Sequence, residues 1–185
     1  MKEAREKRVK ATLVVAGLLK NQRGEILLVE RNGDWTLPTG HMDVRRDADL
    51  RETLDREMKE ELKGLKSLTI IEALDTFVRY SELVRNKGSS LKPKSIAIYS
   101  CNVHDNEIEY FNEGGKRRDK IWLRPSQALK LANLDDLAKL AISRFLEKYP
   151  GTAKTAKKEE EENQNGGKCL DKGSGKGIFV ECQTA

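Results

Sequence analysis

Apolar residues in the first two thirds of the chain fall in short runs separated by polar, glycine-containing segments. Six of these runs are rich in β-branched and aliphatic residues: 11–20, 25–31, 68–79, 95–103, 107–111 and 119–124. Runs of this length, bounded by turn residues, predict β-strands. The residues at 21–24 are Asn-Gln-Arg-Gly, which predicts a turn, so the first two strands are expected to form a hairpin.

Two other segments follow the helical period instead. Between residues 49 and 62, apolar side chains recur at every fourth position: Leu50, Leu54, Met58 and Leu62. This spacing places them along one face of an α-helix. The segment 134–149 has a similar apolar face, with Asn133 as its expected N-cap. A shorter helical turn is expected near Ser126, just after a proline.

Short strands mixed with two separated helices predict a sheet that is covered on both faces. With 185 residues, 37% of them hydrophobic, the chain can form one good core and hardly two. We therefore expect a single folded domain over residues 1–150.

The composition changes abruptly after Pro150. Residues 151–185 contain several lysines, a run of glutamates at 159–162 and then a stretch rich in asparagine and glycine. Low hydrophobicity and low complexity are typical of segments that do not fold alone. We expect 151–185 to be a disordered tail that is dispensable for folding and catalysis.

Charge and cysteine content narrow the function classes. The net charge is +5, from 35 basic and 30 acidic residues, which suits an anionic substrate without requiring nucleic acid. The three cysteines, Cys101, Cys169 and Cys182, are odd in number and lack metal-ligand spacing, which indicates a reducing compartment. The chain has two histidines, so a zinc site is not expected.

The start of the chain has the pattern of a secretion signal, because a basic segment at 1–10 precedes an apolar run at 11–19. However, no small-residue cleavage site follows, and a hairpin accounts for both apolar runs. No stretch is long enough to cross a membrane. We expect a cytoplasmic protein without membrane contact, whose oligomeric state stays open, a homodimer included.

Three carboxylates lie around the apolar face of the helix expected at 49–62. On the helical wheel Glu57 and Glu61 fall on either side of Leu50, and Glu60 lies further round on the Glu57 side. Acids at the edge of a buried face are costly unless a cation meets them. Their spacing lets the oxygens converge, which favours a hard cation such as Mg²⁺. Ordinary surface pairs with neighbouring lysines are the alternative.

A loop rich in proline and glycine, Trp35 to Met42, precedes this helix. Together with Arg-Glu-Met-Lys-Glu-Glu at 56–61, it resembles the signature of the Nudix hydrolases, G-x5-E-x7-R-E-U-x-E-E-x-G-U, in which U is apolar. Gly40 corresponds to the first glycine. The later segment Ile121-Trp122-Leu123 resembles a late strand of the family, so the resemblance covers residues 10–149.

The chain departs from the Nudix pattern at three places. Gly40 lies two residues too far from Arg56, so the loop between them is expanded. Ala48 stands where the first glutamate of the pattern is expected, with an aspartate on either side. The closing glycine comes one position late, as Gly64.

The resemblance implies an α/β fold of the α+β type, an α/β/α sandwich with a mixed sheet. It also implies an active site that uses Mg²⁺, with Mn²⁺ as an alternative ion. Glu57 and Glu61 are then metal ligands, Glu60 completes the cluster, and the Gly40 carbonyl adds a backbone ligand. Arg56 is expected to hold one of the carboxylates through a forked hydrogen bond. The general base varies within the family and stays open.

Other residues are candidates for the substrate site. Four arginines near the ends of expected strands are candidates for phosphate contacts: Arg31, Arg79, Arg117 and Arg118. Asp119 is the candidate for a further acid at the site, with Glu113 as second choice. Tyr80 lies sixteen residues after Gly64, a spacing associated in the family with dinucleoside polyphosphate substrates. Trp35 is expected either to stack on a base or, by preference, to seal the core under the loop.

The function implied by the resemblance is hydrolysis of the pyrophosphate bond of a nucleoside diphosphate linked to another group. Dinucleoside polyphosphates, ADP-ribose, nucleotide-sugars and nucleoside triphosphates are all open as substrates, and a small nucleotide is the expected partner. The alternative is a Nudix-like nucleotide-binding module that has lost turnover. The expanded loop, Ala48 and the displaced glycine favour that alternative.

Overall fold

The structure, a computed structural model, describes residues 11–85, 88–104, 108–111 and 114–150, and between 80 and 92 it describes only the backbone. The expected tail at 151–185 lies outside the described residues. The elements are, in chain order, β1 (Thr12–Lys20), β2 (Ile26–Arg31), β3 (Asp34–Thr36), β4 (Thr39–His41), α1 (Leu50–Glu61), β5 (Leu62–Lys63), β6 (Leu68–Arg85), β7 (Gly88–Val103), β8 (Glu109–Phe111), β9 (Arg117–Arg118), β10 (Lys120–Leu123), α2 (Pro125–Ala128) and α3 (Asp136–Lys148).

The main sheet is mixed. Its strands run in the order β10-β2-β1-β7-β6, with β3 paired to β2 and β4 paired to β1. β1 and β7 are parallel along the whole of β1, whereas the other pairs are antiparallel. β1 pairs with β2 only at Lys20 and Ile26, and with β4 from Val14 to Ala16. β1 therefore has β2 as its neighbour at its C-terminal end and β4 as its neighbour in its N-terminal half, near the loop that leads to α1.

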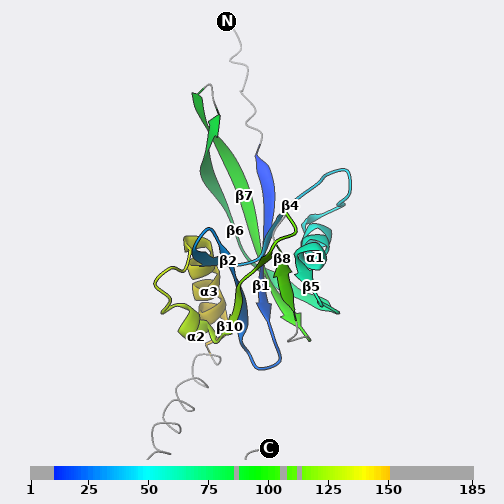
Figure 1. Cartoon of the computed structure of the whole chain (residues 1–185), viewed down its shortest axis with the longest axis vertical. Coiled ribbons are helices and arrows are strands. Elements are labelled where there is room, and N and C mark those ends of the chain that lie inside the picture. The colour runs from blue at the N-terminus through cyan, green and yellow to red at the C-terminus, as the bar shows by residue number, and fades with distance from the viewer. Residues whose placement is uncertain (1–10, 86–87, 105–107, 112–113, 151–185) are drawn as a thin grey trace, which may run out of the picture.

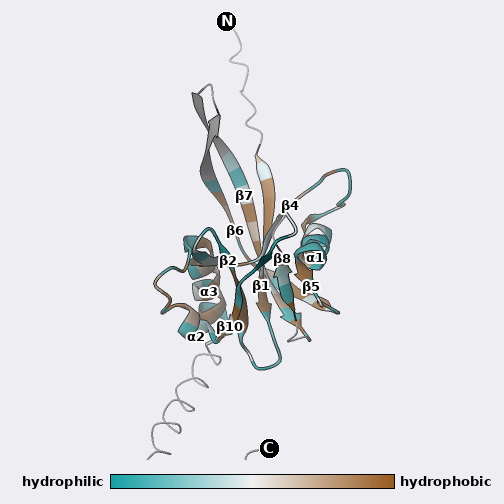
Figure 2. Cartoon of the chain, viewed as in Figure 1, coloured by the Kyte–Doolittle hydropathy of each residue, from teal (hydrophilic) through white to brown (hydrophobic). Residues whose placement is uncertain are grey.

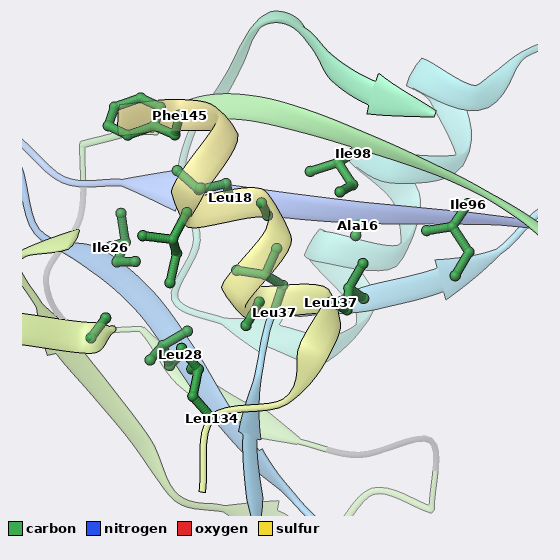
Figure 3. Close-up of a cluster of buried hydrophobic side chains, with 14 of the residues drawn as sticks. Ala16, Leu18, Ile26, Leu28, Leu37, Ile96, Ile98, Leu134, Leu137 and Phe145 are labelled. Atoms are coloured by element: carbon green, nitrogen blue, oxygen red, sulfur yellow. The ribbon is translucent and has the colours of Figure 1, made fainter. Parts of the chain in front are cut away.

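Side chains of β1 alternate between two hydrophobic cores, one on each face of the sheet. Val14, Ala16 and Leu18 point into the core formed with α3, while Val15 and Leu19 point into the core formed with α1. Figure 3 shows the first core, in which α3 crosses the sheet. In Figure 1, α1 lies on one side of the central strands and α2 and α3 lie on the other. The expected α/β/α sandwich with a mixed sheet is confirmed.

Hydropathy follows this layering. Hydrophobic colouring runs along β1, and hydrophilic colouring marks the visible turns of α1 (Figure 2). Leu54 and Met58 of α1 are fully buried, whereas Lys59 and Glu60 are exposed. The four-residue apolar spacing thus decided which face of α1 is buried. In the described part of the chain, no helix is long and apolar enough to span a membrane.

Most elements match the sequence pattern. The helix expected at 49–62 is α1, the turn expected near Ser126 is α2, and the six expected strands are present. The hairpin between β1 and β2 is confirmed: the Asn21 amide donates to the Glu25 carbonyl at 2.9 Å, and Gly24 has a φ of 75°. Gly24 suits this turn because a side chain would strain a positive φ.

The N-cap expected for the last helix was wrong. Asp135, not Asn133, caps α3, and its carboxylate accepts a hydrogen bond from the Ala138 amide at 2.7 Å. Asn133 is held elsewhere: its side chain donates to the Gly33 carbonyl at 2.7 Å, and its carbonyl accepts from the Trp35 amide at 2.8 Å. These bonds tie the segment before α3 to β3, so the helix begins two residues later than predicted.

The hairpin of β6 and β7 is longer than the pattern predicted. The expected strands at 68–79 and 95–103 extend toward each other until Arg85 pairs with Gly88. The ladder of an antiparallel pair is made by the backbone, so it continues where the apolar pattern ends. β3, β4, β5 and β9 were not predicted either, because two or three residues carry no measurable period.

Candidate active site

The start of α1 is fixed by two acids. Asp49 is the N-cap, and its carboxylate accepts hydrogen bonds from the amides of Arg51 and Glu52 at 2.7 and 2.9 Å. The Glu52 side chain reaches back to the Ala48 amide at 2.8 Å. Together they satisfy amides that the first turn of a helix leaves without partners. The orientation of α1, and so of its glutamates, is set at this end.

Asp47 and Arg56 form a forked ion pair beneath the loop that precedes α1. Arg56 Nε lies 2.7 Å from Asp47 Oδ1, and Arg56 Nη2 lies 2.8 Å from Asp47 Oδ2. Only 2% of the Asp47 side chain is exposed. The hydrogen bonds from Arg56 hold the pKa of Asp47 well below its usual range, against a smaller opposing effect of burial. The amide of Asp43 and the hydroxyl of Thr53 also donate to Asp47.

Arg56 also contacts the glutamates of its own helix. Its Nη1 lies 3.0 Å from Glu57 Oε1 and 3.1 Å from Glu60 Oε2, and its Nη2 donates to the His41 carbonyl at 3.0 Å. The expected forked hydrogen bond of Arg56 is therefore present, but the fork holds Asp47 rather than a glutamate. Arg56 joins the expanded loop, β4 and α1 in one network.

Gly40 brings the backbone of β4 against Glu57. A Cβ atom at position 40 would lie 2.0 Å from Glu57 Cγ and 2.4 Å from Glu57 Cβ, far inside contact distance. The next amide, that of His41, donates to Glu57 Oε1 at 3.2 Å. Only glycine allows this approach. The Gly40 backbone and the Glu57 carboxylate are consequently neighbours, as expected for two ligands of one ion.

Replacing Gly40 with alanine is expected to push Glu57 out of place. The clash involves Glu57 Cβ as well as the flexible end of the side chain, so α1 itself must shift. A misplacement of this size lowers a hydrolysis rate by roughly 10-fold to 100-fold. Steady-state hydrolysis with Mg²⁺ measures it. Gly24→Ala is the control, since a Cβ there meets nothing within 4 Å and only backbone strain is added. Equal rates for the two variants would contradict the proposed contact.

Glu61 is the most buried of the three glutamates. Its side chain is 5% exposed, against 14% for Glu57 and 48% for Glu60. Arg31 Nη2 lies 3.5 Å from Glu61 Oε1 and 3.2 Å from the Tyr110 hydroxyl, and Arg31 Nη1 donates to Thr39 Oγ1 at 3.0 Å. Arg31 therefore connects β2 and β4 to the glutamate at the end of α1.

Mg²⁺ fits these donors. Among the described residues, no three His, Cys, Asp or Glu side chains lie close enough together to enclose an ion by themselves. Mg²⁺ does not need such a cage, because proteins usually hold it with one or two carboxylates plus phosphate oxygens of the substrate. Glu57 and Glu61, one turn apart on α1, and the Gly40 backbone offer oxygen donors. Glu60 is more exposed than these two glutamates and forms ion pairs with Arg46 and Arg56.

A cleft of about 550 Å³ opens beside this site, on the face of the sheet that α3 covers. Its lining comes from six strands and the start of α3: Val14, Arg31, Asn32, Asp34, Thr36, Thr39, His41, Arg79, Lys94, Ile96, Asp135 and Leu137. Arg31 thus lies both in the cleft and against Glu61. The described residues that line the cleft include none from α1, which packs on the opposite face of the sheet. Arg31, whose guanidinium contacts Glu61, and His41, whose amide donates to Glu57, connect the cleft to the helix.

The match with known families settles the identity of this fold and helix. The model of the NUDIX domain family matches residues 10–145, well over half of the chain. The chain belongs to the Nudix family. Membership makes it a Nudix-type pyrophosphohydrolase, with α1 as the helix that carries the family's acidic motif. A search of curated proteins finds no match.

Solved structures share the fold at low sequence identity. The MutT protein of Methanosarcina mazei Go1 has a TM-score of 0.58 and 17% identity, covering 77% of this chain and 97% of its own. A binary complex of the C. elegans Ap4A hydrolase has a TM-score of 0.55 and 22% identity, covering 76% and 99%. The NUDIX domain of Shewanella oneidensis NrtR, complexed with ADP ribose, has a TM-score of 0.53 and 19% identity, covering 76% and 90%.

Two departures from the Nudix pattern have structural explanations. Ala48 occupies the slot of the first glutamate, but its neighbour Asp47 supplies a buried carboxylate to Arg56. Gly64, which comes one position late, has a φ of 86° in the turn after β5, where a side chain would be strained.

The remaining candidates lie in different places. Trp35 packs against the core shared with α3 and does not line the cleft, which is the preferred expectation. Asp119 is exposed beside β10, where its carbonyl accepts from the Glu30 amide at 2.8 Å, and it does not line the cleft either. Tyr80 pairs with Pro93 through its backbone, but its side chain is outside the described part, as is Glu113.

Of the four candidate arginines, the cleft contains Arg31 and Arg79. Arg117 lies 3.1 Å from Glu109, and Arg118 lies 3.7 Å from Glu30, on the outer surface near β9. The sequence argument missed Asp47, Thr39 and Lys94. Asp47 could have been found from the sequence, because it is an acid next to Ala48, where the Nudix pattern expects its first glutamate. For the other two, only strand pairing shows that they reach the cleft.

Proposed function

We propose that this Nudix protein is a Mg²⁺-dependent enzyme that cleaves the pyrophosphate bond of a nucleoside diphosphate linked to another group. The observation that carries the proposal is the junction at Arg31, where the cleft meets α1. One guanidinium contacts Glu61 and also lines the cleft. A diphosphate bound at the Arg31 end of the cleft would contact a cation that is itself adjacent to Glu61 of α1.

Each residue has a proposed role. Glu57, Glu61 and the Gly40 carbonyl would hold the ion, and Glu60 would join them by exchanging its ion pair with Arg46. A bound Mg²⁺ would supply neutralisation of the phosphate charge and a water acidic enough to attack at neutral pH. Arg31 binds a phosphate oxygen of the substrate with a charge-assisted hydrogen bond.

Arg56 positions the acids rather than binding substrate. Two nitrogens of its guanidinium pair with Asp47, and its remaining contacts are with Glu57, Glu60 and the His41 carbonyl. We infer that Asp47, next to the position of the missing first glutamate, takes its place by pairing with Arg56. This argues against the alternative of an inactive binding module, since the missing glutamate was a main reason for that reading.

The residues that line the cleft indicate part of the chemistry of the substrate. The lining combines three cations and two acids, Asp34 and Asp135, with an apolar floor of Val14, Ile96 and Leu137. Cations suit phosphate groups, and an apolar floor suits a base or sugar. The solved relatives are described with Ap4A hydrolase activity and with bound ADP ribose. Both compounds are nucleoside diphosphate derivatives, and both belong in the substrate panel.

We expect purified protein to release a nucleoside monophosphate from such compounds only when a divalent ion is present. Incubation with Mg²⁺ and a panel of dinucleoside polyphosphates, ADP-ribose, nucleotide-sugars and nucleoside triphosphates, followed by chromatography, measures it. Chelation with EDTA should abolish turnover, and excess Mg²⁺ or Mn²⁺ should restore it. Binding of a panel compound without turnover at any divalent ion would instead establish the inactive module.

A further inference from the structure

Arg79 and Lys94 face each other across two antiparallel strands in the cleft. They are direct register partners in the β6–β7 ladder, and both line the cleft. Side chains of such partners project on the same face of the sheet. Like charges in this arrangement repel, which costs folding free energy unless an anion lies between them. The strands thus present two cations side by side to whatever occupies the cleft.

Within the described part of the chain, no acid forms an ion pair with Arg79 or Lys94. The acids at the start of α3 are committed elsewhere. Asp135 caps the helix through the Ala138 amide, and Asp136 lies 3.9 Å from Lys139. Asp34 and Asp135 line the same cleft and Asp136 lines a neighbouring pocket with Arg79, but none of the three lies within ion-pair distance of Arg79 or Lys94, so both cations can bind a ligand.

The pair lies well away from the acids of α1. Across the sheet the order is β4, β1, β7 and β6, and His41, Val14, Ile96 and Phe77 form one register row. Lys94 and Arg79 lie two residues away along β7 and β6, on the same face of the sheet. At about 4.8 Å between neighbouring strands, Lys94 is roughly 10 Å and Arg79 roughly 14 Å from the strand of Gly40. A diphosphate held beside α1 does not fill this second position.

We propose that Arg79 and Lys94 form a second anion subsite, which selects substrates that carry a phosphate beyond the scissile diphosphate. This inference rests on the proposed function, because it takes the scissile bond to lie beside α1. Val14 on β1 and Ile96 on β7 lie between β4 and β6, and this apolar floor receives the uncharged part of the ligand. The extra phosphate belongs either to a longer polyphosphate chain or to a phosphomonoester on a ribose.

The test uses two matched pairs of pyrophosphate compounds. One pair differs in chain length, diadenosine diphosphate against diadenosine tetraphosphate. The other differs by a ribose phosphate, NADH against NADPH. For wild type we expect about tenfold higher kcat/KM on the extra-phosphate member of one pair, through a lower KM, since charge-assisted bonds of this kind change affinity by about that factor. The pair that shows the preference identifies the source of the phosphate.

In the double variant Arg79→Gln, Lys94→Gln this preference should fall to near unity, while the melting temperature stays equal or rises because a repulsion is removed. The control, Arg23→Gln, Lys130→Gln, removes the same charge from exposed positions outside the cleft and should keep the preference. Equal kcat/KM within both pairs for wild type, or a preference that survives in the Arg79 and Lys94 variant, would overturn the subsite.

Failure of the proposed function gives a different result. In that case wild type hydrolyses none of the four compounds with Mg²⁺. Calorimetric binding of the same compounds in EDTA then decides the subsite on its own. Tighter binding of an extra-phosphate member to wild type, lost in the double variant, supports the subsite without catalysis. Identical binding by wild type and variant rejects it.

Discussion

Replacing Glu61 with glutamine is expected to lower kcat by about two to three orders of magnitude, because a charged ligand of the ion is lost while the shape of the side chain is kept. Glu61 is the most buried acid of α1 and is adjacent to Arg31, where the cleft meets the helix. Steady-state hydrolysis with Mg²⁺ measures the loss. Calorimetry should show weaker binding of Mg²⁺ or Mn²⁺ to the same variant.

The control for this variant is Asp55→Asn, which removes one negative charge from the exposed side of the same helix. Among the described residues Asp55 forms an ion pair with Lys59 alone, at 2.6 Å, and exposed pairs of this kind contribute little. Its rate should match wild type, and both variants should keep the circular dichroism spectrum. Full activity in Glu61→Gln, with ordinary metal affinity, would show that the ion is held elsewhere.

Replacing Asp47 with asparagine is expected to cause the largest loss of stability. The change leaves the guanidinium of Arg56 without its forked partner in a largely buried position, and removal of one member of a buried pair is strongly destabilising. We expect the melting temperature to fall by many degrees, several times the effect of Asp55→Asn. The rate should fall as well, because Arg56 orients Glu57 and links α1 to β4. Thermal unfolding followed by circular dichroism measures the first effect.

The ion pair also predicts a pH dependence. Arg56 holds the pKa of Asp47 below its unfolded value of about 4, so the carboxylate stabilises the folded state fully above that pH. As the pH falls below about 4, the unfolded chain takes up a proton that the folded chain excludes, and this contribution is lost. Chemical denaturation at a series of pH values should show the loss in wild type and a smaller one in Asp47→Asn. Parallel curves would contradict the pair.

The catalytic helix was predictable because its signals are local. The apolar spacing from Leu50 to Leu62 defines the helix and its buried face, and the Arg-Glu-x-x-Glu-Glu motif identifies the acids. The partner of Arg56 was not predictable in the same way. Counting along the chain led to Ala48, whereas the structure places Asp47, at the end of the turn that begins at Asp43, against the guanidinium. Loop conformation is decided by tertiary contacts, not by residue counting.

Which residues line the cleft was even less predictable from the sequence, because it depends on how the strands pair in the folded sheet. Arg79 and Lys94 lie fifteen positions apart, and nothing in the sequence indicates that they are partners. β6 has two register shifts, between Ile70 and Glu72 and between Ala73 and Asp75. These shifts determine which residue of β7 lies opposite Arg79. A single shift of one residue would turn a side chain to the opposite face. Only the observed pairing places both cations in the cleft.

The sequence by itself therefore determined the kinds of element, the layered sheet and the family, because hydrophobic period and a compact motif are properties of neighbouring residues. The tertiary structure decided which charges meet. Arg56 meets Asp47 from the loop before its own helix, Arg31 meets Glu61 thirty positions away, and Arg79 lies beside Lys94 across a ladder. Such contacts depend on strand register and loop path, and both are selected by packing of the whole domain.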